Sequence, residues 1–144
     1  GMIYEDLAMA YEHIHYCAEI AVGYRSVYKY YRRMGSTVNS KYSERLLNFY
    51  NAMEWNRSYI ERDYPNDKEM RRALNVRYVF NGLHVVHAML SSNMYSDVNK
   101  IRKEYTRYFS DIIPNPNITG KKKVKYLLLL LSPRLYKKIR GKIG

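Results

Sequence analysis

The stretch NDKEMRRALNVRYVFNGLHVVHAML, residues 66–90, predicts the central helix of the fold. Pro65 ends the segment before it, and Asn66 is a candidate N-cap with Glu69 three positions later. Gly82 costs about 1 kcal/mol relative to alanine inside a helix, so its presence favours a close helix crossing. Apolar side chains cover more than one helix face, which is typical of a buried helix. They are Leu74, Tyr78, Val79, Phe80, Leu83, Val86 and Leu90.

Helical patterns continue on both sides of this stretch. Three- and four-residue apolar steps predict a helix between Ser40 and Pro65. Ser96 is a candidate N-cap for a third helix, which prolines 114 and 116 stop. A fourth helix is expected over residues 121–131, and Ser132 followed by Pro133 predicts the start of a fifth.

The first forty residues differ from this pattern. Residues 4–17 predict a short helix, whereas residues 18–22 and 26–31 are rich in β-branched and aromatic side chains and predict strands. Residues 34–40 have the composition of a loop and mark a boundary. We therefore expect a mainly α protein, a helical bundle of about five helices with a short β-hairpin or extended pair near residues 18–33. The expected division is residues 1–39 and a helical domain of residues 40–144.

Composition limits the class of protein. The 144 residues are 47% hydrophobic and 26% charged, enough apolar side chain for one folded core. The single cysteine, Cys17, excludes a disulfide framework and a cysteine-based zinc site. No run approaches the roughly 20 apolar residues of a membrane-spanning helix. We expect no bound metal in this chain.

The charge is concentrated at one end. The net charge is +12, yet all 13 acidic residues lie at or before Asp111, and residues 119–144 carry nine Lys and Arg. Such a basic tail favours an anionic surface, of lipid or of nucleic acid. The tail also has five consecutive leucines, too few to span a bilayer but enough for an amphipathic helix in the headgroup region. The predicted membrane contacts are Lys121, Lys122, Lys123, Lys125, Lys137, Lys138 and Arg140. The alternative is that the leucines pack on the helical body and the lysines face water.

Two runs carry a resemblance to a known family. The first is YEDLAMAYEHIHYCAEIAVGYRSVYKYYRRMGSTVNS, residues 4–40, and the second is KKKVKYLLLLLSPRLYKKIRGK, residues 121–142. The first run has an acidic pair that opens a helix, an alanine-led strand entry, a Tyr-rich strand and an Arg-containing loop that ends in serine. In this order it resembles the C-terminal end of the catalytic domain of bacterial family 2 glycosyltransferases. The second run resembles the helical tail of the same enzymes.

This resemblance implies a function for an intact parent enzyme. Such an enzyme transfers a sugar from a nucleotide-sugar donor to a polysaccharide or lipid-linked acceptor. The family's nucleotide-binding half and its Asp-x-Asp metal motif are absent from these residues. A divalent cation, Mg²⁺ or Mn²⁺, is therefore expected only in an intact parent, and this chain alone is expected to be inactive.

The resemblance also implies roles for particular residues. It assigns Asp6 as the general base on the acceptor hydroxyl, with Glu5 as its neighbour. The alternative for both carboxylates is a stabilising charge at the start of a helix. Arg32, Arg33 and Ser36 are candidates for contact with a diphosphate or a lipid-linked acceptor, since guanidinium groups match phosphate geometry. The alternative for these three is a solvated loop.

The histidines and the cysteine, which could in principle bind a metal or react, have simpler structural interpretations. His13 and His15 face different directions on a helix and cannot chelate one metal. His84 and His87 share a face, and among apolar neighbours they are predicted to be satisfied, partly buried histidines. Cys17 is predicted to be a buried small apolar residue.

Two functions of other classes remain open. Net charge and 17 tyrosines favour a basic helical nucleic-acid-binding module. However, leucines rather than a polar recognition face follow the lysine cluster, and no helix-turn-helix or zinc signature is present. Nucleic acid is therefore disfavoured as a partner. The tyrosines also favour an oligomerising helical scaffold, that is, a homo-oligomer. For the glycosyltransferase hypothesis we expect a cytoplasmic location, peripheral on the inner face of the cell membrane.

Overall fold

The computed structural model describes residues 3–26, 28–29, 31 and 42–142 and is mainly helical, as predicted. The α-helices are α1 (Glu5–His15), α2 (Asn48–Asp63), α3 (Lys68–Ser91), α4 (Tyr95–Tyr105), α5 (Phe109–Ile112), α6 (Gly120–Leu131) and α7 (Pro133–Ile139). Short 3₁₀ turns are η2 (Glu44–Leu47), η3 (Thr106–Tyr108) and η4 (Arg140–Lys142). The expected third helix is thus divided, because η3 separates α4 from α5.

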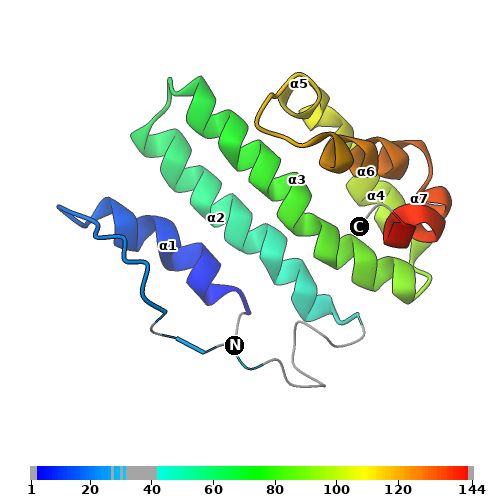
Figure 1. Ribbon diagram of the computed structural model, residues 1–144, viewed down its shortest axis with the longest axis horizontal. Helices are drawn as coiled ribbons and strands as arrows, with labels where there is room; N and C mark the ends of the chain where they lie inside the picture. Colours follow the sequence, from blue (N-terminus) through cyan, green and yellow to red (C-terminus); the bar gives the residue numbers. More distant parts are fainter. Residues whose placement is uncertain (1–2, 27, 30, 32–41, 143–144) are drawn as a thin grey trace.

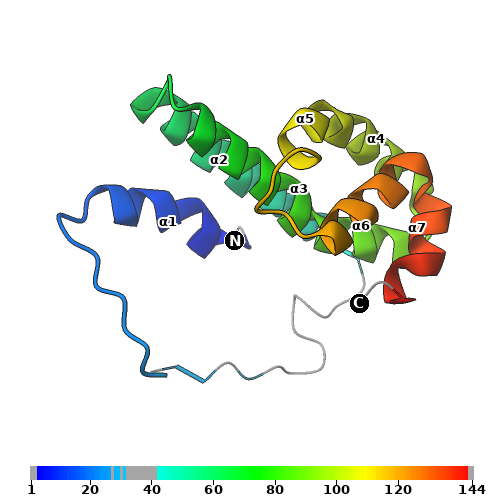
Figure 2. The same cartoon turned by 45° about the horizontal axis from the view of Figure 1, so that its top comes forward.

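Helices α1, α2 and α3 lie side by side in one layer (Figure 1). Helices α2 and α3 form an antiparallel hairpin that turns at Pro65, whereas α1 runs in the same direction as α2. Helices α4 to α7 gather on the other side of α3 (Figure 2). Helix α3 therefore lies at the centre of the bundle, as its wide apolar surface predicted.

The basic tail contributes to the core of this bundle. Tyr126 and Leu129 of α6 and Tyr136 of α7 are fully buried and belong to the same core as Val79 and Val86 of α3. The Tyr126 hydroxyl donates a hydrogen bond to the backbone oxygen of Tyr105 over 2.7 Å. The tail is consequently a structural part of the helical body, and its removal would expose the core.

Gly82 allows α3 to approach its neighbours closely, as its position predicted. A Cβ atom there would overlap the hydroxyl of Tyr105 and lie 3.2 Å from that of Tyr50. These two hydroxyls share a hydrogen bond of 3.0 Å. Tyr105 is fully buried in the core, so a methyl group added at Gly82 would force its ring or α3 to shift.

Helix starts were predicted with mixed success. Ser132 is the N-cap of α7 as expected, since its Oγ accepts from the backbone N–H of Leu135 at 3.3 Å and Pro133 follows. The prediction of Asn66 as a cap was wrong, because Asp67 accepts from the backbone N–H of Met70 at 2.9 Å. Ser96 lies inside the first turn of α4, which already begins at Tyr95.

The predicted β-hairpin is not formed by the described residues. Residues 18–26, 28–29 and 31 contain no strand. Their apolar side chains face solvent, and Tyr24 is 100% exposed. The β-like composition is real, but a two-stranded ribbon without a sheet or helix to pack on is marginal in water. The predicted boundary at residue 39 lies outside the described residues.

Candidate functional site

The start of α1 is fixed to the central helix by one polar contact. The Tyr4 hydroxyl lies 2.5 Å from Nε2 of His84 on α3. Nδ1 of His84 contacts the backbone oxygen of Asn81, which only accepts, so Nδ1 carries the proton and Nε2 accepts from Tyr4. The Tyr4 ring also packs edge-on against Phe49 of α2. Tyr4 thus connects α1 to both of the long helices.

Further along α1, hydrogen bonds hold it on α2. Asn56 is 5% exposed and donates to the backbone oxygen of Leu7 over 2.8 Å. The Tyr11 hydroxyl donates to Asp63 over 3.0 Å. The Arg62 guanidinium beside Asp63 is the main cause that lowers the pKa of that carboxyl to about 2, so it remains an acceptor for Tyr11. These contacts fix both the position and the rotation of α1.

Glu5 and Asp6 occupy the first turn of this anchored helix, as the sequence predicted, and both are exposed. Asp6 Oδ1 accepts from the backbone N–H of Leu7 over 2.8 Å. Among the described residues, neither carboxylate forms an ion pair with Lys, Arg or His. Asp6 is therefore oriented yet open to an approaching hydroxyl. The macrodipole alternative for both residues stands beside this, because a first-turn carboxylate faces the positive helix end.

The remaining predicted substrate contacts cannot be placed in this arrangement. Arg32, Arg33 and Ser36 lie outside the described residues. Their proposed contact with a diphosphate or lipid-linked acceptor stays a prediction.

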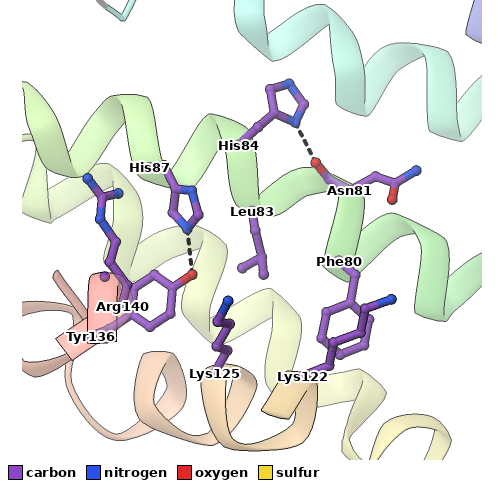
Figure 3. A pocket seen from close by; sticks show the side chains of 10 residues that line it. Phe80, Asn81, Leu83, His84, His87, Lys122, Lys125, Tyr136 and Arg140 are labelled. Carbon is purple, nitrogen blue, oxygen red and sulfur yellow. Dashed lines mark hydrogen bonds between the residues drawn. The ribbon is translucent and has the colours of Figure 1, made fainter. Parts of the chain in front are cut away.

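A second feature lies beside the His84 anchor, where α3 faces the tail. It is a cavity of about 590 Å³ (Figure 3). Phe80 and Leu83 give it apolar walls, whereas Lys122, Lys125 and Arg140 bring three cationic side chains to it. The side chains that complete the lining are Asn81, His84, His87, Tyr136 and Gly141.

His87 and Tyr136 close one side of this cavity. His87 Nε2 and the Tyr136 hydroxyl lie 2.5 Å apart and share a hydrogen bond. Burial, followed by the nearby charges of Arg140 and Lys125, lowers the pKa of His87 to about 4. Burial likewise raises the pKa of Tyr136 to about 12. Both groups are therefore uncharged at neutral pH, and the cavity's formal charge comes from its Lys and Arg.

The predicted membrane contacts separate into groups in the structure. Lys122, Lys125 and Arg140 line the cavity, although Lys122 is exposed. Lys137 donates to Asn93 over 3.0 Å. The remaining predicted contacts are Lys121, Lys123 and Lys138, and these three do not line the cavity.

An apolar row lies on the outer side of α6. Val124, Leu127 and Leu131 are 46%, 37% and 73% exposed, and steps of three and four residues place them on one face. Leu135 of α7 is also 39% exposed. Some leucines thus pack on the helical body, as the second alternative predicted, and others face outward; contact of the tail with a membrane stays a prediction.

Two further sequence predictions can be compared with the structure. Cys17 is exposed, so its predicted burial was wrong; it follows the end of α1, and no helix among the described residues covers it. His84 and His87 are half-buried and hydrogen-bonded, as predicted.

In the described part of the chain, no cluster of three or more His, Cys, Asp or Glu is arranged to hold a metal ion. Nor does any described helix combine the length and apolar character needed to cross a bilayer.

Sequence reasoning missed the cavity, although part of its signal was visible. His84 and His87, like Lys122 and Lys125, are three residues apart and share a helix face. Whether these two pairs meet depends on how α6 packs against α3, which no local sequence pattern predicts.

A second polar cluster, around Arg57, was also missed: Arg57 contacts Glu54, Glu61 and Asn75. Arg57 is thus paired with carboxylates of α2 and hydrogen-bonded to α3, which fits a structural network between these helices.

Comparisons with models of known protein families, with curated proteins and with solved structures find no match to this chain.

Proposed function

We propose that this chain is the acceptor-side, C-terminal part of a glycosyltransferase that moves a sugar from a nucleotide-sugar donor to a polysaccharide or lipid-linked acceptor. The observation that carries the proposal is the acidic pair at the start of α1. Asp6 is exposed and oriented by its own backbone contact, on a helix fixed by Tyr4, Asn56 and Tyr11. A general base needs this combination of fixed position and free access.

The role of Asp6 is to take the proton of the acceptor hydroxyl as that oxygen attacks the sugar. In an inverting transfer, such a base stands on the face of the sugar opposite the leaving group. Glu5 adds negative charge next to it. The nucleotide diphosphate and its divalent cation would be bound by residues that are not part of this chain.

The tail supports an acceptor that lies at a membrane. Its exposed row of Val124, Leu127 and Leu131 is flanked along α6 by Lys121 and Lys123. An apolar face edged by lysines suits insertion among anionic headgroups, where each cation contributes about 1 kcal/mol.

The experiment compares sugar transfer by this chain alone with transfer by the complete gene product that contains it. Both are incubated with a panel of nucleotide sugars, Mn²⁺ or Mg²⁺, and membranes as the acceptor source. We expect transfer by the complete product and none by residues 1–144 alone. Turnover by the isolated chain, or no transfer by the complete product with any donor, would contradict the proposal.

A further inference from the structure

The cavity between α3 and the tail has the dimensions of a ligand site. Its volume of about 590 Å³ falls within the roughly 300–1,000 Å³ typical of pockets for small molecules. Leu83 lies among the cationic side chains, and Phe80 forms a wall at one end (Figure 3). An occupant would thus meet both charge and apolar surface.

Charge in this cavity has one sign. Lys122, Lys125 and Arg140 line it, and no acidic side chain does so among the described residues. Nor do any of the three form an ion pair with a carboxylate in the described part of the chain. Gathering like charges beside apolar walls is unfavourable, and a bound anion would offset that cost.

Arg140 supplies the most specific observation. Its Nη1 atom is buried and has no hydrogen-bond partner among the described residues. Its Nη2 atom makes only a long contact of 3.4 Å with the hydroxyl of Ser91. A buried guanidinium nitrogen without an acceptor costs free energy, and a phosphate oxygen is the acceptor that its geometry matches best.

We propose that this cavity binds a phosphate-bearing ligand, with the phosphate held by Lys122, Lys125 and Arg140 and the remainder resting on Phe80 and Leu83. The ligand is either a free organic phosphate or the headgroup of a phospholipid, because both present the same oxygens. The site contains neither Glu5 nor Asp6. The proposal of a phosphate site can therefore be tested independently of the proposal of sugar transfer.

His87 provides a reporter inside the site. It lies with Arg140, Lys125, His84 and Tyr136 in the cavity lining. Burial is the main cause that lowers the pKa of His87, followed by Arg140, Lys125 and His84. A bound anion would compensate those positive charges and raise the pKa of His87. NMR resonances of the His87 ring would report this change directly.

The test titrates the full chain with inorganic pyrophosphate at constant ionic strength while the His87 ring resonances are followed. We expect a saturable shift and a higher pKa for His87. Lys125→Gln and Arg140→Gln should each weaken binding at least tenfold, whereas Lys103→Gln, an exposed cation of α4 outside the cavity, should bind like the wild type. If Arg140→Gln does not fold, Lys122→Gln replaces it, since Lys122 is exposed.

A second arm separates the two sources of phosphate. Vesicles of phosphatidylcholine with phosphatidic acid are compared with phosphatidylcholine alone. A His87 shift with the anionic vesicles, abolished by Lys125→Gln, assigns a lipid headgroup; a shift with pyrophosphate alone assigns a free phosphate ligand. The proposal is overturned if neither probe gives a saturable shift, or if Lys103→Gln weakens binding as much as Lys125→Gln.

Discussion

The hydroxyl of Tyr4 donates to Nε2 of His84 across 2.5 Å and 80 residues of sequence. Tyr4 immediately precedes the acidic pair, and His84 lines the basic cavity. Two residues span at most about 7 Å of chain, so the contact also limits where the backbone of Asp6 can lie relative to α3. One contact therefore joins the two features that carry the functional proposals.

Replacing Tyr4 with phenylalanine tests whether this contact positions α1. Tyr4→Phe keeps the ring against Phe49 but removes the donor to His84, at a cost of about 1 kcal/mol of unfolding free energy. We expect faster amide hydrogen exchange in α1 and little change in α3. The control is Tyr24→Phe, whose side chain is 100% exposed. Unchanged exchange in α1 would show that Tyr4 does not hold the helix.

Gly82 tests the close helix approach. Gly82→Ala gains about 1 kcal/mol of helix propensity but forces its new methyl group against the fully buried Tyr105. Overpacking of this kind costs about 1–3 kcal/mol, so we expect a net loss of stability in urea unfolding. Adding Tyr105→Phe to Gly82→Ala should recover part of the loss by removing the hydroxyl. A stabilised Gly82→Ala variant would contradict the observed packing.

His87 predicts a pH dependence of stability. Its pKa is about 4 in the folded chain, below the ordinary value of 6.5. As the pH falls from 6.5 to 4, the unfolded chain binds a proton at His87 that the folded chain does not, so this residue lowers stability across that window. His87→Gln keeps a hydrogen-bonding group near Tyr136 and should flatten the profile between these pH values. Identical slopes for the two proteins would contradict a buried, neutral His87.

The outer face of α6 predicts binding to anionic vesicles. The chain should float with phosphatidylglycerol vesicles, float less as salt screens the lysines, and not float with neutral vesicles. Leu127→Asn with Leu131→Asn should reduce flotation several-fold, because both leucines face outward. The control, Met70→Asn, changes an exposed apolar residue in the first turn of α3, outside the tail. Equal flotation of wild type and the double variant would place the leucines outside the lipid contact.

These point variants are preferable to removal of the tail. Tyr126, Leu129 and Tyr136 are fully buried, so a chain that ends at Asn115 would lose core residues as well as lysines. Loss of flotation by such a chain would not separate membrane binding from unfolding.

Local signals predicted the helices well because each is encoded by its own residues. The spacing of apolar side chains gave α3, and the Ser132–Pro133 pair gave the start of α7. The β-rich composition of residues 18–31 was misleading, because a strand also needs a partner and no local pattern supplies one. Cys17 was misplaced for the same reason: its burial depends on a neighbouring layer.

The same difference between local and long-range signals applies to the candidate sites. The acidic pair was found because its two residues are adjacent at a helix start. The cavity was not found, since His87 and Arg140 are far apart in the sequence and meet only when α7 and η4 pack on α3. Long-range packing of this kind produces no periodic pattern in the amino-acid sequence.

Substitution of Asp6 in the complete gene product tests the central claim most directly. Sugar transfer is measured for the wild type, for Asp6→Asn and for Glu69→Gln, an exposed acid in the first turn of α3 that serves as the matched control. A general base contributes about 10²- to 10⁴-fold to rate, so we expect Asp6→Asn to lower kcat by at least 100-fold while Glu69→Gln leaves it unchanged. Full transfer activity in Asp6→Asn would contradict the account.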